Sequence, residues 1–307
     1  MSVTLCLLLG WLLAPAQAPV RVELNHFVEL NSFLLSQATI TGPARPEYAP
    51  FVQVYGRHSA DPPAVWQVVH DVSVNAADIA ALAGRAKALP ESDAARPLLE
   101  AMAGAWPIYE KHDRALRQGS LENAARELER RFTRKAEPLL MPELIDRLQL
   151  KPLEQPISIY PINRSPRPGG SGRSAHGFYV VLPISGQPIL ESLLHELTHV
   201  LDDNQPAGQN TVLSRIVAQA RGVDPAGRDA FIHGLIMWNA REMVKRRVGP
   251  EGSSGFPASM TPYLKIYESR WGPYLDGTSN ADQTIRGMLE DLARTSPSTT
   301  SPPPSSR

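Results

Sequence analysis

The stretch Pro188 to Asp203, PILESLLHELTHVLDD, is the part of the sequence from which the fold and the chemistry can be predicted. A proline suits the first turn of a helix, and the apolar residues after it recur at helical spacing over a broad surface. The pattern therefore predicts a mostly buried helix. The apolar positions are Ile189, Leu190, Leu193, Leu194, Leu197, Val200 and Leu201.

Three chemically active residues interrupt this helix as an HExxH motif, His195, Glu196 and His199. A four-residue step turns an α-helix by about 400°, so the two imidazoles lie roughly 40° apart on one face and can reach one ion. Glu196 lies about 100° from His195 and suits a general base acting on water beside that ion. The alternative is two core histidines bonded to backbone carbonyls beside a paired glutamate.

Composition indicates a soluble globular protein with no preference for polyanions. The chain has 307 residues, of which 42% are hydrophobic and 20% charged, and its 31 Lys+Arg balance its 31 Asp+Glu. A zero net charge gives no electrostatic footprint for a nucleic acid or an anionic membrane surface. We therefore expect neither as a partner.

Residues 1–18 have the pattern of a secretory signal peptide, with an apolar run followed by Ala16-Gln17-Ala18 as a small-x-small cleavage site. The run is too short to span a bilayer comfortably. The alternative is a buried N-terminal helix. We expect a secreted or periplasmic protein, without stable membrane insertion after cleavage. Its mature form would have no thiol, because Cys6 is the sole cysteine.

Changes in amino-acid composition and apolar spacing along the chain predict three further regions. Residues 19–150 are rich in Ala, Leu, Glu and Arg, which predicts a mainly helical N-terminal region. Residues 151–294 carry two predicted strands, Pro156–Ile162 and Gly177–Pro183, on either side of a Pro/Gly/Ser/Arg loop from 164 to 173. We expect these strands to form a small antiparallel sheet above the motif helix. Residues 295–307 have the composition of a disordered Pro/Ser/Thr-rich tail.

A strand, a short turn and then an HExxH helix resemble the zincin metallopeptidases. The resemblance implies an α+β, mostly helical protein with a zincin-like catalytic core at 151–294, a zinc ion and peptide-bond hydrolysis. It also implies that the strand before the motif helix is an edge strand that pairs with the substrate backbone. Here that strand is 178–182, so Tyr179, Val180 and Val181 are the expected substrate-binding residues.

A catalytic zinc site needs a third protein ligand. The metzincin pattern is absent, because position 205 is Gln. The predicted helix at 228–248 offers His233 and Glu242, which are nine residues apart and so point to roughly opposite sides. We favour Glu242, because it lies on an aromatic and aliphatic stripe where an unpaired carboxylate is costly. His233 is the alternative, and Glu268 a remoter one.

With Glu242 as ligand, the set resembles that of the gluzincin branch. The spacing also resembles a group of uncharacterised secreted bacterial proteins that have an H-x8-E helix after HExxH, where His233 and Glu242 are the matching positions. In this arrangement His233 is a candidate catalytic residue that stabilises an oxyanion.

Supporting roles fall on acids and tyrosines. Acids within a turn of the histidines would accept their second ring N–H, unless they are merely solvated or capping groups. Tyrosines of the 261–277 segment could donate to an oxyanion, although core packing is the commoner role of such residues. The acids are Glu191, Asp202 and Asp203, and the tyrosines are Tyr263, Tyr267 and Tyr274. Two lone histidines, His58 and His70, are further candidate ligands, although histidines outside a spaced pair are more often ordinary polar residues.

The sequence therefore predicts a secreted zinc metallopeptidase that acts on a peptide or protein substrate, with Glu196 as general base. Two alternatives stay open. One is a non-catalytic secreted zinc-binding or cell-envelope interaction protein, and the other is a helical domain without metal. An intact Glu196 argues against the first, since a structural zinc site needs no base and closes with a fourth protein ligand.

Overall fold

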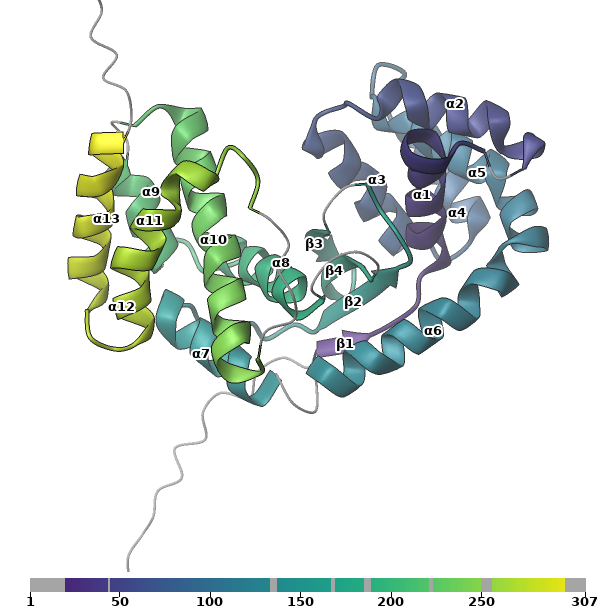
Figure 1. Cartoon of the computed structure of the whole chain (residues 1–307). Helices are drawn as coiled ribbons and strands as arrows, with labels where there is room; N and C mark the ends of the chain where they lie inside the picture. The colour runs from purple at the N-terminus through teal and green to yellow at the C-terminus, as the bar shows by residue number, and fades with distance from the viewer. Residues whose placement is uncertain are drawn as a thin grey trace, which may run out of the picture.

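The computed structural model describes residues 20–43, 45–132, 137–166, 169–184, 189–220, 223–249 and 256–295 (Figure 1). The predicted signal peptide at 1–18, Cys6, Pro188 and all of the predicted tail except Thr295 lie outside these ranges. The fold is α+β and mostly helical, at 69%, with a small mixed sheet of four strands. The predicted fold class is confirmed at this level.

The first half of the described chain is helical apart from one short strand that joins the sheet. In chain order its elements are β1 (Val20–Val22), α1 (His26–Ser36), η1 (Gln37–Thr41), η2 (Pro46–Tyr48), α2 (Ala49–His58), α3 (Pro63–Asn75), α4 (Ile79–Ala88), α5 (Ala95–His112), α6 (Arg114–Arg131) and α7 (Glu137–Leu148).

The second half contains the other three strands and the helices that follow them. These are β2 (Ile157–Ile162), β3 (Gly170–Ser174), β4 (Gly177–Pro183), α8 (Ile189–Asp203), α9 (Val212–Gln219), α10 (Pro225–Arg247), η5 (Thr261–Tyr263), α11 (Leu264–Ile266), η6 (Tyr267–Trp271), α12 (Gly272–Leu275) and α13 (Ala281–Thr295). The motif helix is α8, as its apolar spacing predicts.

The sheet has the order β1-β2-β4-β3, in which β1, β2 and β4 are parallel and β3 is antiparallel to β4. The predicted antiparallel pairing of the two long strands is therefore wrong. Much of the segment that we expected to be a loop is strand β3, and it runs back along β4 before a tight turn at 175–176. That extra reversal of the chain leaves β2 and β4 pointing the same way.

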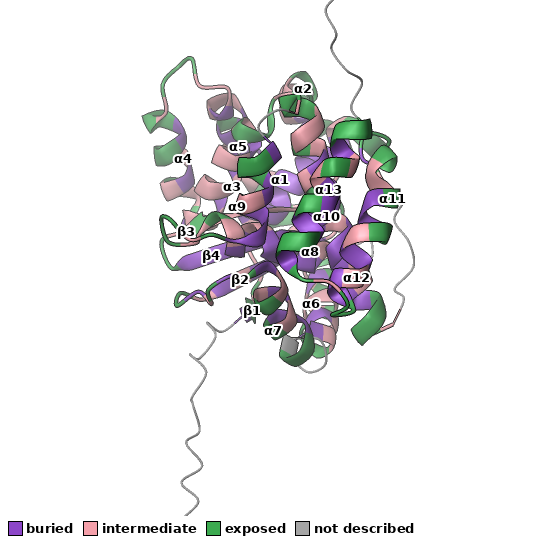
Figure 2. Ribbon diagram, turned by 90° about the vertical axis from the view of Figure 1, so that its left-hand side faces the viewer, coloured by how far each residue is buried: buried purple, intermediate pink, exposed green. Residues whose placement is uncertain are grey.

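Side chains alternate between the two faces of the sheet, as in any strand. On the α8 side the sheet contributes to the larger hydrophobic core, through Ile157, Ile159, Phe178, Val180 and Leu182. On the other side it packs against α1, where Val28 meets Tyr160, Ile162, Tyr179 and Val181. The strands are thus covered by helices on both faces, and Figure 2 shows most of β2 and β4 as buried.

Two hydrophobic cores lie on opposite sides of the sheet region. Helices α1 to α5 share one core, which includes the buried rings of Tyr48, Tyr55 and Tyr109. The other core joins α8 to α13 with the sheet and also contains residues from α6 and α7, such as Leu128 and Leu144. The hydrophobic core therefore crosses the predicted boundary at residue 150. Figure 1 shows α1 to α5 on one side of the strands and α9 to α13 on the other, with α8 between them.

Among the described helices, none combines the length and the apolar character needed to cross a membrane.

Candidate metal centre

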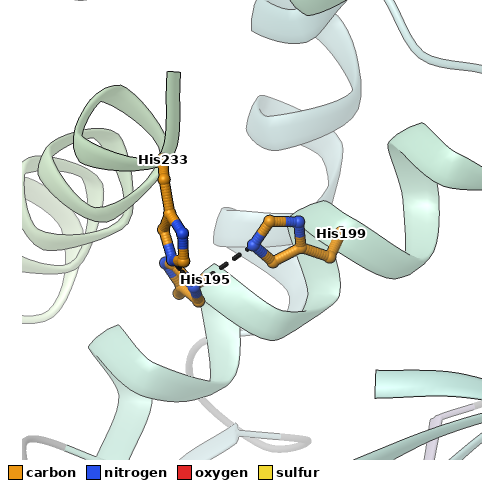
Figure 3. Close-up of side chains that lie close together, drawn as sticks. All are labelled: His195, His199 and His233. Carbon is orange, nitrogen blue, oxygen red and sulfur yellow. Dashed lines mark hydrogen bonds between the residues drawn. The ribbon is translucent and has the colours of Figure 1, made fainter. Parts of the chain in front are cut away.

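Helix α8 places two imidazoles side by side. Its apolar face is buried against β4 and α10, while His195 and His199 project together from the same side, one turn apart (Figure 3). Their Nε2 atoms lie 3.3 Å apart, and their ring centroids are separated by 4.8 Å at an interplanar angle of 74°. The structure thus has the pairing that the four-residue spacing predicts.

The third imidazole comes from α10. This helix begins at Pro225, and its N-cap Asp224 accepts a hydrogen bond from the backbone N–H of Gly227. Eight residues into the helix, His233 reaches towards α8, and its Nε2 lies 3.0 Å from Nε2 of His195 (Figure 3). The candidate ligand atoms of the three histidines all lie within 4.8 Å of one another.

This donor set fits a metal ion of the zinc type. A tetrahedral zinc ion bound at about 2.0–2.1 Å by two imidazole nitrogens separates those nitrogens by about 3.3 Å, close to both Nε2 distances to His195. Imidazole is a borderline donor that suits Zn²⁺, Cu²⁺, Fe²⁺ or Ni²⁺ better than Ca²⁺ or Mg²⁺. The three histidines therefore lie close enough together to hold a metal ion.

The local electrostatics keep these histidines in the form that binds metals. Burial lowers the pKa of His195 well below its ordinary value, and the neighbouring His199 and His233 lower it further. Burial likewise lowers the pKa of His199, and burial together with His199 lowers that of His233 to about 4. Neutral imidazoles that converge on one point offer lone pairs to a cation.

Glu196 lies against the edge strand β3. Its side chain is buried, at 6% exposed, and a hydrogen bond from the side chain of Ser171 partly opposes the effect of burial, which raises the pKa of Glu196 to about 7. Gly169, just before β3, comes so close that a Cβ there would lie 3.1 Å from Oε1 of Glu196. The carboxylate therefore lies between α8 and the start of β3.

Glu242, our favoured third ligand, is not brought to the histidines. Its carboxylate oxygens lie 3.3 Å from Nζ of Lys245 and 3.8 Å from Nε of Arg246, one turn further along α10. The physical reason is that cations of its own helix meet the need for a partner that we had assigned to a metal. Because the two candidates point to opposite sides of α10, the structure that brings His233 to His195 leaves Glu242 outside the cluster.

The apolar stripe of α10 misled the choice, because its apolar residues pack in the large core that α8 shares and do not mark a metal ligand. Phe231, Leu235 and Trp238 all belong to the large core. The feature of the sequence that pointed to the cluster is a histidine away from that stripe, His233, on a helix that packs beside α8. A metal ligand at Nε2 of His233 cannot also donate from Nε2 to an oxyanion, so the two roles that the sequence offers for His233 exclude each other. Glu268 is exposed and does not belong to the cluster.

The predicted substrate strand is wrong in its position. Strand β4 is flanked by β2 and β3, so the backbone of Tyr179, Val180 and Val181 is already paired and cannot accept a peptide strand. The Tyr179 hydroxyl already has a hydrogen-bond acceptor within the protein, because it donates to Oδ1 of Asp71 at 2.5 Å. The edge strands of the described sheet are β1 and β3, and the β3 sequence GSGRS lacks the apolar residues by which strands are recognised.

Three of the six predicted acids and tyrosines have other hydrogen-bond partners. Nδ1 of His195 is buried without a hydrogen-bond partner among the described residues, so none of the three acids orients this ring. Asp202 accepts instead from the hydroxyl of Thr211, the N-cap of α9. The hydroxyls of Tyr267 and Tyr274 donate to backbone carbonyls, of Phe231 and Arg147 respectively.

The remaining candidates have places outside the cluster. Tyr263 packs edge-on against Phe231, with ring centroids 5.4 Å apart. His58 lies 2.7 Å from the carboxylate of Asp61, and His70 lies beside Gly170 of β3. None of them belongs to the group of three histidines.

Comparison of the chain with protein-family models, with curated proteins and with solved structures finds no match in any of the three. Any assignment of function therefore rests on the motif and on the geometry of the residues around it.

Proposed function

We propose that this protein is a zinc-dependent metallopeptidase with a zincin-like catalytic region, in which His195, His199 and His233 bind the ion and Glu196 is the general base. The observation that carries the proposal is the convergence of the third histidine on the HExxH pair, at 3.0 Å from His195. Convergence from a second helix is not explained by helical spacing alone. The proposed set is three histidines, and it replaces the gluzincin-like set with Glu242.

Zinc in a site of three histidines supplies a Lewis acid and lowers the pKa of water. The chain supplies the proton transfers. Glu196 follows His195 directly in α8, so its carboxylate can take a proton from the attacking water and then deliver it to the leaving amine. The buried position of Glu196 beside Ser171 and Gly169 gives this carboxylate one defined orientation.

The substrate-binding strand in this proposal is β3 in place of β4. β3 is the edge strand next to β4 in the described sheet, and Glu196 lies at its start. An extended peptide that adds to β3 on the side away from β4 would gain main-chain hydrogen bonds, a common mode of peptide recognition. Its path would then run past the proposed base.

Secretion is part of the same proposal. It is supported by the apolar run and the small-x-small site within residues 1–18, which lie outside the described residues. The balance of acidic and basic residues continues to favour a peptide or protein substrate over a nucleic acid.

One observation favours the non-catalytic alternative, a secreted zinc-binding or envelope-interaction protein. Glu196 is 6% exposed and is hydrogen-bonded to Ser171, as a purely structural carboxylate could be. In that case the zinc site would persist without turnover. The two functions predict different results when the Glu196 carboxylate is removed. A peptidase would lose hydrolysis and keep its zinc, whereas a non-catalytic protein would have no hydrolysis to lose.

The test combines elemental analysis with a peptide-library screen on the purified protein, for the wild type, Glu196→Gln and His199→Ala. The proposal expects about one zinc per chain in the wild type and in Glu196→Gln, and little in His199→Ala. It expects hydrolysis by the wild type alone. If the wild type and Glu196→Gln both bind zinc and neither hydrolyses peptides, the non-catalytic alternative is supported. If the wild type binds no zinc, both functions are refuted.

A further inference from the structure

The distance between the two helices that carry the histidines has to be fixed by contacts outside the site itself. We propose that the buried Tyr267 is a positioning residue for the metal centre, because its hydroxyl holds the turn of α10 that carries His233. The inference rests on the proposed zinc site and adds to it a residue that does not touch the metal.

The three histidines differ in what fixes their positions. His195 and His199 are four residues apart on α8, so the helix backbone alone sets their separation. His233 belongs to α10, and its approach to His195 depends on how α10 is placed against α8. Ligands have to be held within about 0.5 Å of their working geometry, so a small shift of α10 would spoil the site.

Tyr267 contacts α10 just before the histidine. It is fully buried at the start of the π-helical turn η6, and its hydroxyl donates to the backbone carbonyl of Phe231 at 2.7 Å. Its ring also packs on Phe231, with centroids 5.4 Å apart, and near Trp238 at 6.4 Å. Phe231 precedes His233 by two residues, so this bond acts on the turn that carries the ligand.

Gly234 shows how closely the tyrosine approaches on the other side of His233. Glycine in a helix interior is less favourable than alanine, so its presence here calls for a local reason. A Cβ at this position would lie 2.6 Å from the Tyr267 hydroxyl oxygen and 3.2 Å from Cβ of Met260. The hydroxyl therefore rests directly on the α10 backbone between Phe231 and Gly234, where α10 cannot slide or rotate without breaking this contact.

The same π-helical turn makes a second buried bond to α10 that serves as a matched control. Nε1 of Trp271 donates to Oδ1 of Asn239 at 2.9 Å, and both residues are buried. Asn239 follows His233 by six residues, which is about 9 Å along the helix axis. Loss of either bond removes one buried hydrogen bond between η6 and α10, but only the Tyr267 bond lies at the turn of His233.

The experiment measures the zinc affinity of the purified full chain by competition with a chromophoric chelator, for the wild type, Tyr267→Phe and Trp271→Phe. Urea unfolding of the zinc-free proteins reports their stability. We expect both variants to lose stability. Tyr267→Phe should also bind zinc about 10-fold more weakly or worse, as is usual for groups that orient ligands. Trp271→Phe should stay within about twofold of the wild type.

A second comparison tests the contact itself. Gly234→Ala alone should weaken zinc binding, because the new methyl group meets the Tyr267 hydroxyl. In a Tyr267→Phe background the closer of its two contacts is gone, so the same substitution should cost less than it does alone. Independent, fully additive effects of the two substitutions would contradict the proposal.

The outcomes separate this inference from the proposed function. Wild-type affinity in Tyr267→Phe, or equal losses in Tyr267→Phe and Trp271→Phe, would overturn the positioning role alone. Zinc binding by the wild type without peptide hydrolysis would overturn the proposed peptidase activity and leave the positioning role intact. A wild type that binds no zinc would overturn both.

Discussion

Helices α8 and α10 bring histidines to the same point in two different ways. On α8 the separation of His195 and His199 follows from the helical repeat, and no tertiary contact is needed to explain it. On α10 the position of His233 depends on the packing of α10 against α8 and on the hydrogen bond from Tyr267 to the backbone of α10. The comparison shows that a site within one helix can be predicted from spacing, whereas a site between helices depends on the fold.

The largest expected effect is the loss of a ligand from either helix. If zinc binding of about 10–16 kcal/mol is shared among a few ligands, His199→Ala and His233→Ala should each weaken it by about 3 kcal/mol, on the order of 100-fold. Chelator competition at neutral pH measures this. A large loss in His199→Ala beside wild-type affinity in His233→Ala would break the proposed equivalence of the two helices.

The next effect is the coupling of zinc to stability. An ion that bridges α8 and α10 stabilises the folded chain by about 2.7 kcal/mol at a free concentration of 100 times Kd. Removal of zinc with EDTA should therefore lower the Tm of the wild type by several degrees. The Tm of His233→Ala should hardly respond, because the bridge between the helices is missing. An equal response in the two proteins would indicate that zinc binds elsewhere.

The smallest effect is expected at Glu242. Its ion-pair partners Lys245 and Arg246 are both exposed, and pairs with exposed cations contribute about 0.2–1 kcal/mol. Glu242→Ala should therefore change the free energy of unfolding by less than about 1 kcal/mol and leave zinc affinity nearly unchanged. Urea unfolding and chelator competition check the two parts. A loss of affinity as large as in His233→Ala would restore Glu242 as the third ligand.

The limits of the sequence prediction follow from the same contrast. The apolar spacing of α8, its two histidines and the apolar strands β2 and β4 are local features, and they were predicted. Strand β3 was missed because GSGRS has no strand propensity of its own. It is extended because it pairs with β4 and lies close to Glu196 on one side and Gln67 on the other.

The structure brings His233 to the motif histidines in place of Glu242 for a related reason. A carboxylate on the apolar stripe of α10 indicated a strong partner, and the partner turned out to be a pair of cations one turn away. Which side of α10 faces α8 is a property of the packed core. Phe231 and Trp238 lie in that core, while His233 on the same helix lies 3.0 Å from His195 of α8.

X-ray absorption spectroscopy of the zinc-loaded protein tests the central claim most directly, since it counts the imidazoles around the ion. The account predicts about three histidine ligands at about 2.0 Å in the wild type and in Glu242→Ala, and two in His233→Ala. Two imidazoles and a carboxylate in the wild type, unchanged by His233→Ala and lost in Glu242→Ala, would contradict it.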